Sequence, residues 1–172
     1  PLPKEAQYST VNGMVVDDFN GDGNLDIAIN GNDYGTEVSV GRYDAMNGLV
    51  LTGDGKGNFS PMSILQSGIF IPGNGKALVQ IASANNTVCI AASENRGPLR
   101  LFELKAKRTL IPILPNEVSA NIYWKDGSSS KTEFYYGSSF QSQSGRHISL
   151  SNKVNKIVIK QANGSARTLS NF

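Results

Sequence analysis

Oxygen-bearing side chains recur at short intervals in one segment near the start of the chain. Residues 18–26 read DFNGDGNLD, which follows the pattern D-x-N-x-D-G-x-x-D. Calcium is a hard cation that takes about six to eight oxygen ligands. The side chains of this segment and one backbone carbonyl supply most of them. The sequence therefore predicts a calcium site whose ligands are Asp18, Asn20, Asp22, Asn24 through its carbonyl, and Asp26.

The residues around these ligands favour a turn between two strands. Gly21 and Gly23 can adopt the positive φ angles that a tight wrap around one point needs. An EF-hand loop would require a bidentate Glu at its twelfth position, which here is Ile29, and a helix on each side. The alternative that stays open is a turn without an ion, because Asn, Asp and Gly also populate tight turns for local reasons.

The elements that would position this loop are strands. Apolar runs at residues 14–16 and 25–29 flank it, and the 18 glycines and several Asn-Gly and Asp-Gly pairs divide the rest into short segments. In residues 118–124 the side chains of Val118, Ala120, Ile122 and Trp124 fall on one face with period two. Residues 131–136 follow an Asp-Gly turn as a hairpin partner. We expect an all-β fold, with Trp124 in the core.

Two prolines mark the expected division of the chain. Pro112 and Pro115 lie in a stretch that suits an extended linker or an edge strand, because proline cannot donate to a central sheet ladder. We place the boundary near Pro112, which gives regions 1–111 and 112–172. Residues 77–104 repeat the strand rhythm of the first region without an aspartate loop, so a second unit there would not hold its own ion.

The segment from Val16 to Ile27 resembles the FG-GAP or VCBS repeat, a β-propeller blade unit, and the Gly-x-Gly-x-Phe stretch ending at Phe59 continues the likeness. Residues 124–127, 136–144 and 156–164 resemble the ASPIC/UnbV domain, which follows such repeats in cartilage acidic protein and related bacterial surface proteins. Ser139 and Gln141 depart from that domain's usual pattern. The resemblance implies about two propeller-like blade units followed by a small C-terminal β-domain.

Composition excludes several partners. With 16 Lys and Arg against 14 Asp and Glu, the net charge of +2 gives no strong field toward nucleic acid. No apolar run approaches the length of about 18 residues that a membrane-spanning helix needs. The chain begins at Pro1, and about two blades are too few for a propeller, so we expect it to be the C-terminal part of a larger polypeptide.

Two polar stretches are candidates for binding. The insertion from Asn30 to Asn47 carries Tyr, Arg and acidic residues that suit glycan or protein contact, although a solvated connector or an arm packed on the next domain is an equal alternative. The stretch from Ser138 to Ser144 is rich in hydroxyls and amides. Its side chains are expected to satisfy turn backbone groups rather than a ligand.

Catalysis finds little support in the residues. His147 is the only histidine and lies on an alternating strand, where we expect it to face solvent or a hydrogen-bond partner. Cys89, the only cysteine, is expected to be a buried, inert thiol. We find no nucleophile elbow, zinc-protease motif or P-loop. No catalytic residues and no organic cofactor are therefore predicted.

The expected function is that of a calcium-stabilised, non-catalytic binding module. Weak calcium sites with dissociation constants of roughly 0.1–1 mM suit an extracellular, periplasmic or outer-surface location. Its partner would be a glycan or protein bound through Asn30 to Asn47. The alternatives are a structural cap of a larger propeller, or the accessory region of an enzyme whose active site lies upstream.

Overall fold

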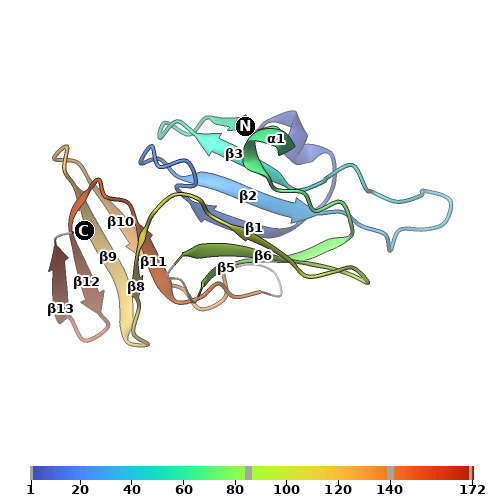
Figure 1. Cartoon of the computed structure of the whole chain (residues 1–172). Coiled ribbons are helices and arrows are strands. Elements are labelled where there is room, and N and C mark those ends of the chain that lie inside the picture. The colour runs from blue at the N-terminus through green and yellow to red at the C-terminus, as the bar shows by residue number, and fades with distance from the viewer. Residues whose placement is uncertain (1, 84–86, 139–141, 171) are drawn as a thin grey trace.

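The computed structural model describes residues 2–83, 87–138, 142–170 and 172, and within them nearly all regular structure is antiparallel β. This confirms the predicted fold class. Figure 1 shows the N-terminal sheets lying beside a separate group of C-terminal strands. The departures at Ser139 and Gln141 lie outside the described residues.

The first sheet carries the acidic loop. Its strands are β1 (Val11–Asp17), β2 (Asp26–Gly31), β3 (Leu49–Gly53) and β4 (Phe59–Pro61), paired in sequence order. β1 and β2 are antiparallel with Asp17 opposite Asp26, so the loop 18–25 closes this hairpin. The runs rich in Val and Ile on both sides of the loop favour the extended conformation.

The second sheet contains β5 (Gly75–Ala82), β6 (Val88–Glu94) and β7 (Arg100–Glu103), again in sequence order. It packs face to face with the first sheet. Apolar side chains from the buried faces of the strands, together with two from the segment before β5, fill the space between the two sheets. They are Val15, Ala28, Val50, Ile69, Ile71, Leu78, Ile90 and Ala92.

The C-terminal strands enclose a second core. β9 (Glu117–Trp124) and β12 (Val154–Gln161) lie at the centre of a four-stranded sheet with β10 (Ser129–Glu133) and β13 (Ala166–Ser170) at its edges. β8 (Thr109–Pro112) pairs with β11 (His147–Leu150). The buried members are Ile111, Ile113, Ala120, Ile122, Leu150, Val154, Ile157 and Ile159. Because β8 contributes Ile111, the change between the cores falls a few residues before the expected division at Pro112.

In the part of the chain that the structure describes, helical structure is limited to two single turns. They are a 3-10 helix at Lys4–Gln7 and α1 at Ile64–Ser67, where Ser63 and Gln66 form a capping box. Among the described residues, none of the helices is long and apolar enough to cross a membrane.

Two expectations about exposure need correction. Val118 is 43% exposed although its strand partners on the predicted face, Ala120 and Ile122, are buried. The register between β9 and β12 shifts at Val118, because Ser119 and Glu117 pair with the consecutive residues Lys160 and Gln161, and this β-bulge interrupts the alternation. Asn30 belongs to β2, and both Asn30 and Asn32 are fully buried, so the exposed insertion begins after Asn32. From there residues 33–45 project as a long arm, seen at the right of Figure 1.

The N-terminal and C-terminal parts meet along β5. The backbone N–H of Gln80 donates to the Ser144 hydroxyl at 3.0 Å, and the N–H of Gly145 donates to the Gln80 carbonyl at 2.7 Å. The Gln80 side chain donates in turn to the Asp17 carboxylate at the end of β1. One residue of β5 therefore connects the C-terminal part to the start of the acidic loop.

Candidate metal centre

Asp26 is the buried anchor of the acidic loop. Its Oδ2 accepts the backbone N–H groups of Phe19 and Asn20 at 2.9 and 3.3 Å, and its Oδ1 accepts that of Gly53 at 2.9 Å. The side chain is completely buried. One carboxylate thus holds the first turn of the loop and ties it to the end of β3.

Asp18 accepts backbone N–H groups from the middle of the loop. Its Oδ1 accepts the N–H of Gly21 at 2.6 Å and its Oδ2 accepts that of Gly23 at 3.0 Å. Both glycines have positive φ, of 84° and 99°, and these angles turn their N–H groups inward. The predicted role of Gly21 and Gly23 in wrapping the chain is therefore observed.

The remaining predicted ligands form the outer rim. Asn20 Oδ1 accepts the N–H of Asp22 at 2.8 Å, and Asp22 Oδ1 accepts that of Asn24 at 2.7 Å. The Asn20 amide also donates to Asp22 Oδ2 at 3.1 Å. The structure therefore brings all five predicted residues into one hydrogen-bonded loop, with Asp18 and Asp26 inside and Asp22 exposed.

Burial leaves negative charge poorly compensated at the base of the loop. Desolvation raises the pKa of Asp26 above its usual value, against the opposing hydrogen bonds from Gly53, Phe19 and Asn20. Desolvation likewise raises the pKa of Asp17. At the exposed rim, desolvation pushes the pKa of Asp22 up, but hydrogen bonds from Asn24 and Asn20 outweigh it, and the pKa is lowered overall.

A distant arginine reaches the same loop. Arg108, in the segment before β8, places Nη1 3.5 Å from Asp18 Oδ2, and its Nη2 donates to the Asp18 backbone carbonyl. Its side chain is 3% exposed, and its Nε is buried without a hydrogen-bond partner. Sequence reasoning missed this residue because nothing in the residues next to Arg108 points to a contact 90 positions away.

The donor set fits a hard cation by its chemistry. All the candidate ligands are oxygens. Both oxygens of Asp18 and Oδ1 of Asp22 each accept one N–H group and keep a second acceptor site, whereas Asp26 Oδ2 already accepts two N–H groups. Against this, the described residues hold no group of three or more His, Cys, Asp and Glu side chains gathered closely enough to grip an ion together. The amide and carbonyl oxygens of Asn20 and Asn24 would have to complete the set.

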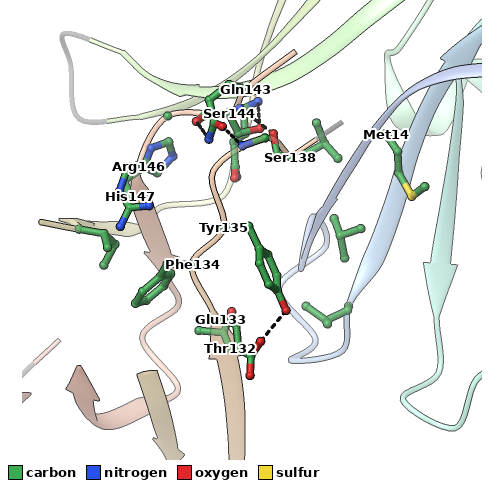
Figure 2. Close-up of a pocket in the computed structure, with 17 residues that line it drawn as sticks. Met14, Thr132, Glu133, Phe134, Tyr135, Ser138, Gln143, Ser144, Arg146 and His147 are labelled. Carbon is green, nitrogen blue, oxygen red and sulfur yellow. Dashed lines mark hydrogen bonds between the residues drawn. The ribbon is translucent and has the colours of Figure 1, made fainter. Parts of the chain in front are cut away.

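A separate cavity lies between the N-terminal and C-terminal parts (Figure 2). It has a volume of about 420 Å³ and is walled by β1 on one side and by residues 132–135, 137–138 and 143–147 on the other. Tyr135 extends toward β1, and its hydroxyl donates to Glu133 at 2.7 Å. Ser138, Gln143 and Ser144 gather at one end.

Most polar side chains at the Ser138 end of this cavity form hydrogen bonds with backbone groups. The hydroxyls of Ser138 and Ser144 accept N–H groups of Ser144 and Gln80, and Gln143 accepts that of Gly137. Ser138, Gln143 and Ser144 therefore satisfy backbone groups, as expected for this stretch, whereas the Ser142 hydroxyl is buried without a hydrogen-bond partner. His147 differs from expectation: it is half-buried, its Nε2 is buried without a partner, and desolvation lowers its pKa.

The arm at residues 33–45 is held at its base and exposed at its tip. Asp33 and Tyr43 exchange backbone hydrogen bonds of 2.9 Å each, and the Arg42 guanidinium lies 4.8 Å from the centre of the Tyr34 ring. Val38 is fully exposed, and Val40 and Tyr43 are about half exposed. The arm therefore offers apolar side chains to solvent on a fixed stem.

A scan against protein-family models finds no match for this chain, and no curated protein matches it significantly.

Proposed function

We propose that this chain is a calcium-stabilised, non-catalytic binding module of an extracellular or cell-surface protein, built from FG-GAP/VCBS-like units and an ASPIC/UnbV-like C-terminal domain. The observation that carries the proposal is the arrangement of the acidic loop. Two buried carboxylates, Asp18 and Asp26, face the interior of a hairpin turn whose rim consists of further oxygen donors. When bound, a calcium ion supplies the positive charge that such a set of carboxylates lacks.

The chain's own residues explain why an ion would stabilise the fold. Asp26 links the loop to β3 through Gly53, and Asp17 links it to β5 through Gln80. Neutralising the loop therefore strengthens a junction that both N-terminal sheets share. A ligand that binds only the folded state raises stability by mass action, by about 2.7 kcal/mol at a hundredfold excess over its dissociation constant.

The arm supports a role in binding. Its exposed Val38, Val40 and Tyr43 stand clear of both cores on a stem that the Asp33–Tyr43 bridge fixes. Fixed exposed apolar side chains are typical of contact surfaces, since they lose little conformational entropy on association. We propose a glycan or protein partner for this arm.

Calcium should raise the melting temperature of the protein, and Asp22→Ala should remove that gain. Asp22 is the suitable ligand to change because it is exposed and holds only rim contacts, so its loss leaves the buried carboxylates paired. The measurement is a thermal melt followed by circular dichroism in millimolar calcium and in chelator.

Asp54→Ala is the matched control. Asp54 is also exposed and also accepts turn N–H groups, from Lys56 and Asn58 at 2.7 and 3.1 Å, but it lies outside the predicted ligand set. This variant should keep the full response to calcium. Identical melts of the unmodified protein with and without calcium would refute the proposed site.

A further inference from the structure

A second cleft opens between the acidic loop and the C-terminal sheet. Its volume is about 520 Å³, within the range of ligand sites, and clefts between domains are favoured places for such sites. Three turns form its walls: residues 22–24 of the loop, residues 124–128 between β9 and β10, and residues 152–153 between β11 and β12. Both parts of the molecule therefore contribute to it.

Trp124 gives the cleft an aromatic wall. It is half-buried, packs against the C-terminal core, and its indole N–H donates to the Ser130 hydroxyl at 3.2 Å. The ring is thus fixed in orientation while still lining the cleft. The expectation that Trp124 serves only the core is incomplete, because a fixed aromatic face also suits the apolar C–H face of a ligand.

The other side chains supply both hydrogen-bond donors and acceptors. The carboxylates are Asp22 and Asp126, the amides Asn24 and Asn152, and the ammonium groups Lys125 and Lys153. Lys153 lowers the pKa of both carboxylates through its charge, although hydrogen bonds are the larger influence on each. With two acidic and two basic groups, the cleft has no net charge.

The aromatic wall and the balanced charges of the cleft favour some classes of ligand over others. Phosphates and acidic polymers would meet the two carboxylates. A purely apolar ligand would take six polar side chains out of water and offer them no new hydrogen bonds. A sugar ring has an apolar face for Trp124 and hydroxyls that both donate and accept. We propose that this cleft binds a neutral oligosaccharide, with Trp124 as the stacking platform. The inference goes beyond the proposed function, since it does not require the arm, although the cleft shares Asp22 and Asn24 with the proposed calcium loop.

The single tryptophan makes the test site-specific. Trp124 is the only tryptophan in the chain, so its fluorescence reports on this cleft alone. We would titrate the full chain with cellohexaose, maltohexaose, mannohexaose and xylohexaose, each up to about 5 mM, which covers weak millimolar binding. At least one should produce a saturable change in emission.

Variants then locate the ligand. Asn152→Ala and Lys153→Ala remove exposed side chains and should each weaken binding about tenfold, the size expected for one lost hydrogen bond. Lys160→Ala removes an exposed lysine on β12 outside the cleft, and Tyr43→Ala alters the arm; both should leave binding unchanged. Trp124→Ala, studied by calorimetry after its melt confirms folding, should abolish binding.

Three results would overturn the inference. The first is the absence of a saturable change with every neutral oligosaccharide. The second is undiminished binding by both Asn152→Ala and Lys153→Ala. The third is preferential binding of hexagalacturonate, because an acidic sugar contradicts the balanced charge of the cleft. Loss of binding in Tyr43→Ala would instead assign the sugar to the arm and would also count against the cleft.

Discussion

At the scale of single residues, Asp26 links the acidic loop to a second segment of the chain through hydrogen bonds. Its two oxygens collect N–H groups from Phe19, Asn20 and Gly53, which belong to two separate segments of the chain. Buried carboxylates are costly unless they are hydrogen-bonded, and this one is tied to both segments. The loop is therefore shaped by its own backbone around the charges that would bind an ion.

Gly53→Ala should destabilise the protein by about 2–3 kcal/mol, the cost of forcing a side chain into a packed site. A Cβ at this position would lie 2.2 Å from the Leu25 carbonyl oxygen, so β3 would have to move away from the loop. The same movement would stretch the hydrogen bond from Gly53 to Asp26. Chemical denaturation measures the change.

Gly57→Ala is the comparison. Gly57 has a positive φ of 90°, which Gly53 does not, and nothing lies within 4 Å of a Cβ built there. Only backbone strain remains, and it should cost about 1 kcal/mol. Equal losses of unfolding free energy in the two variants would contradict the explanation that position 53 requires glycine because β3 approaches the loop closely.

At the scale of elements, the acidic loop interacts with the segment that carries Arg108 through a buried ion pair. The guanidinium of Arg108 is buried against Asp18 and provides one positive charge where the loop would receive a cation. Two positive charges at one carboxylate repel each other, more strongly when water is excluded. Arg108 should therefore stabilise the ion-free loop and weaken its affinity for calcium.

Arg108→Gln should lower stability in chelator by about 2–3 kcal/mol, the usual value of hydrogen bonds to a charged group. It should also enlarge the stabilisation that calcium gives. Arg100→Gln is the control, because Arg100 pairs with Glu94 in the second sheet, away from the loop. A smaller calcium response in Arg108→Gln than in the unmodified protein would contradict this competition.

Local patterns predicted the strands and turns that depend on local sequence. The β1–loop–β2 hairpin and the β9–β10 hairpin follow from alternation and turn residues, and the five predicted ligands all lie in one loop. The pairing of β8 with β11 and the contact of Arg108 with Asp18 were not predicted. Both join segments far apart in sequence, and neither leaves a periodic signal in the residues nearby.

The buried ion pair of the C-terminal sheet is a second contact that local sequence patterns could not predict. Glu117 is completely buried and accepts hydrogen bonds from Arg167, which lower its pKa, and from the N–H of Leu114 at 2.8 Å. Alternation along residues 118–124 indicated the apolar face but gave no sign that the residue before them pairs with an arginine on β13. Such a pair depends on the order of strands in the sheet, which the pattern of one strand does not contain.

At the scale of the whole molecule, two cores are joined through a polar seam. Gln80 accepts and donates across it, and His147 lies on the C-terminal side of the cavity there. Polar seams of this kind are sensitive to charge because water is partly excluded from them. The arrangement of the two parts should therefore depend on the protonation of His147.

Acid should weaken the fold through His147. Desolvation lowers its pKa in the folded state below the unfolded value of about 6.5, so the unfolded chain binds the proton more readily. The stability contribution is complete above that value and is lost as the pH falls through the folded-state pKa. The melting temperature should decline over this interval.

His147→Gln should remove that part of the pH dependence while leaving the decline at lower pH. Since His147 is the only histidine, its ring proton gives one resolved NMR signal whose titration reports the folded-state pKa directly. A titration midpoint at or above the unfolded value would contradict the effect of burial on this ring.

The most direct test of the central claim is an anomalous difference map from crystals grown in roughly millimolar calcium, the range of weak calcium sites. The account predicts one strong peak inside the loop, within coordination distance of Asp18, Asn20, Asp22 and Asp26 and of the Asn24 carbonyl. A map with no peak at this loop, in crystals that show the same β1–β2 hairpin, would contradict it.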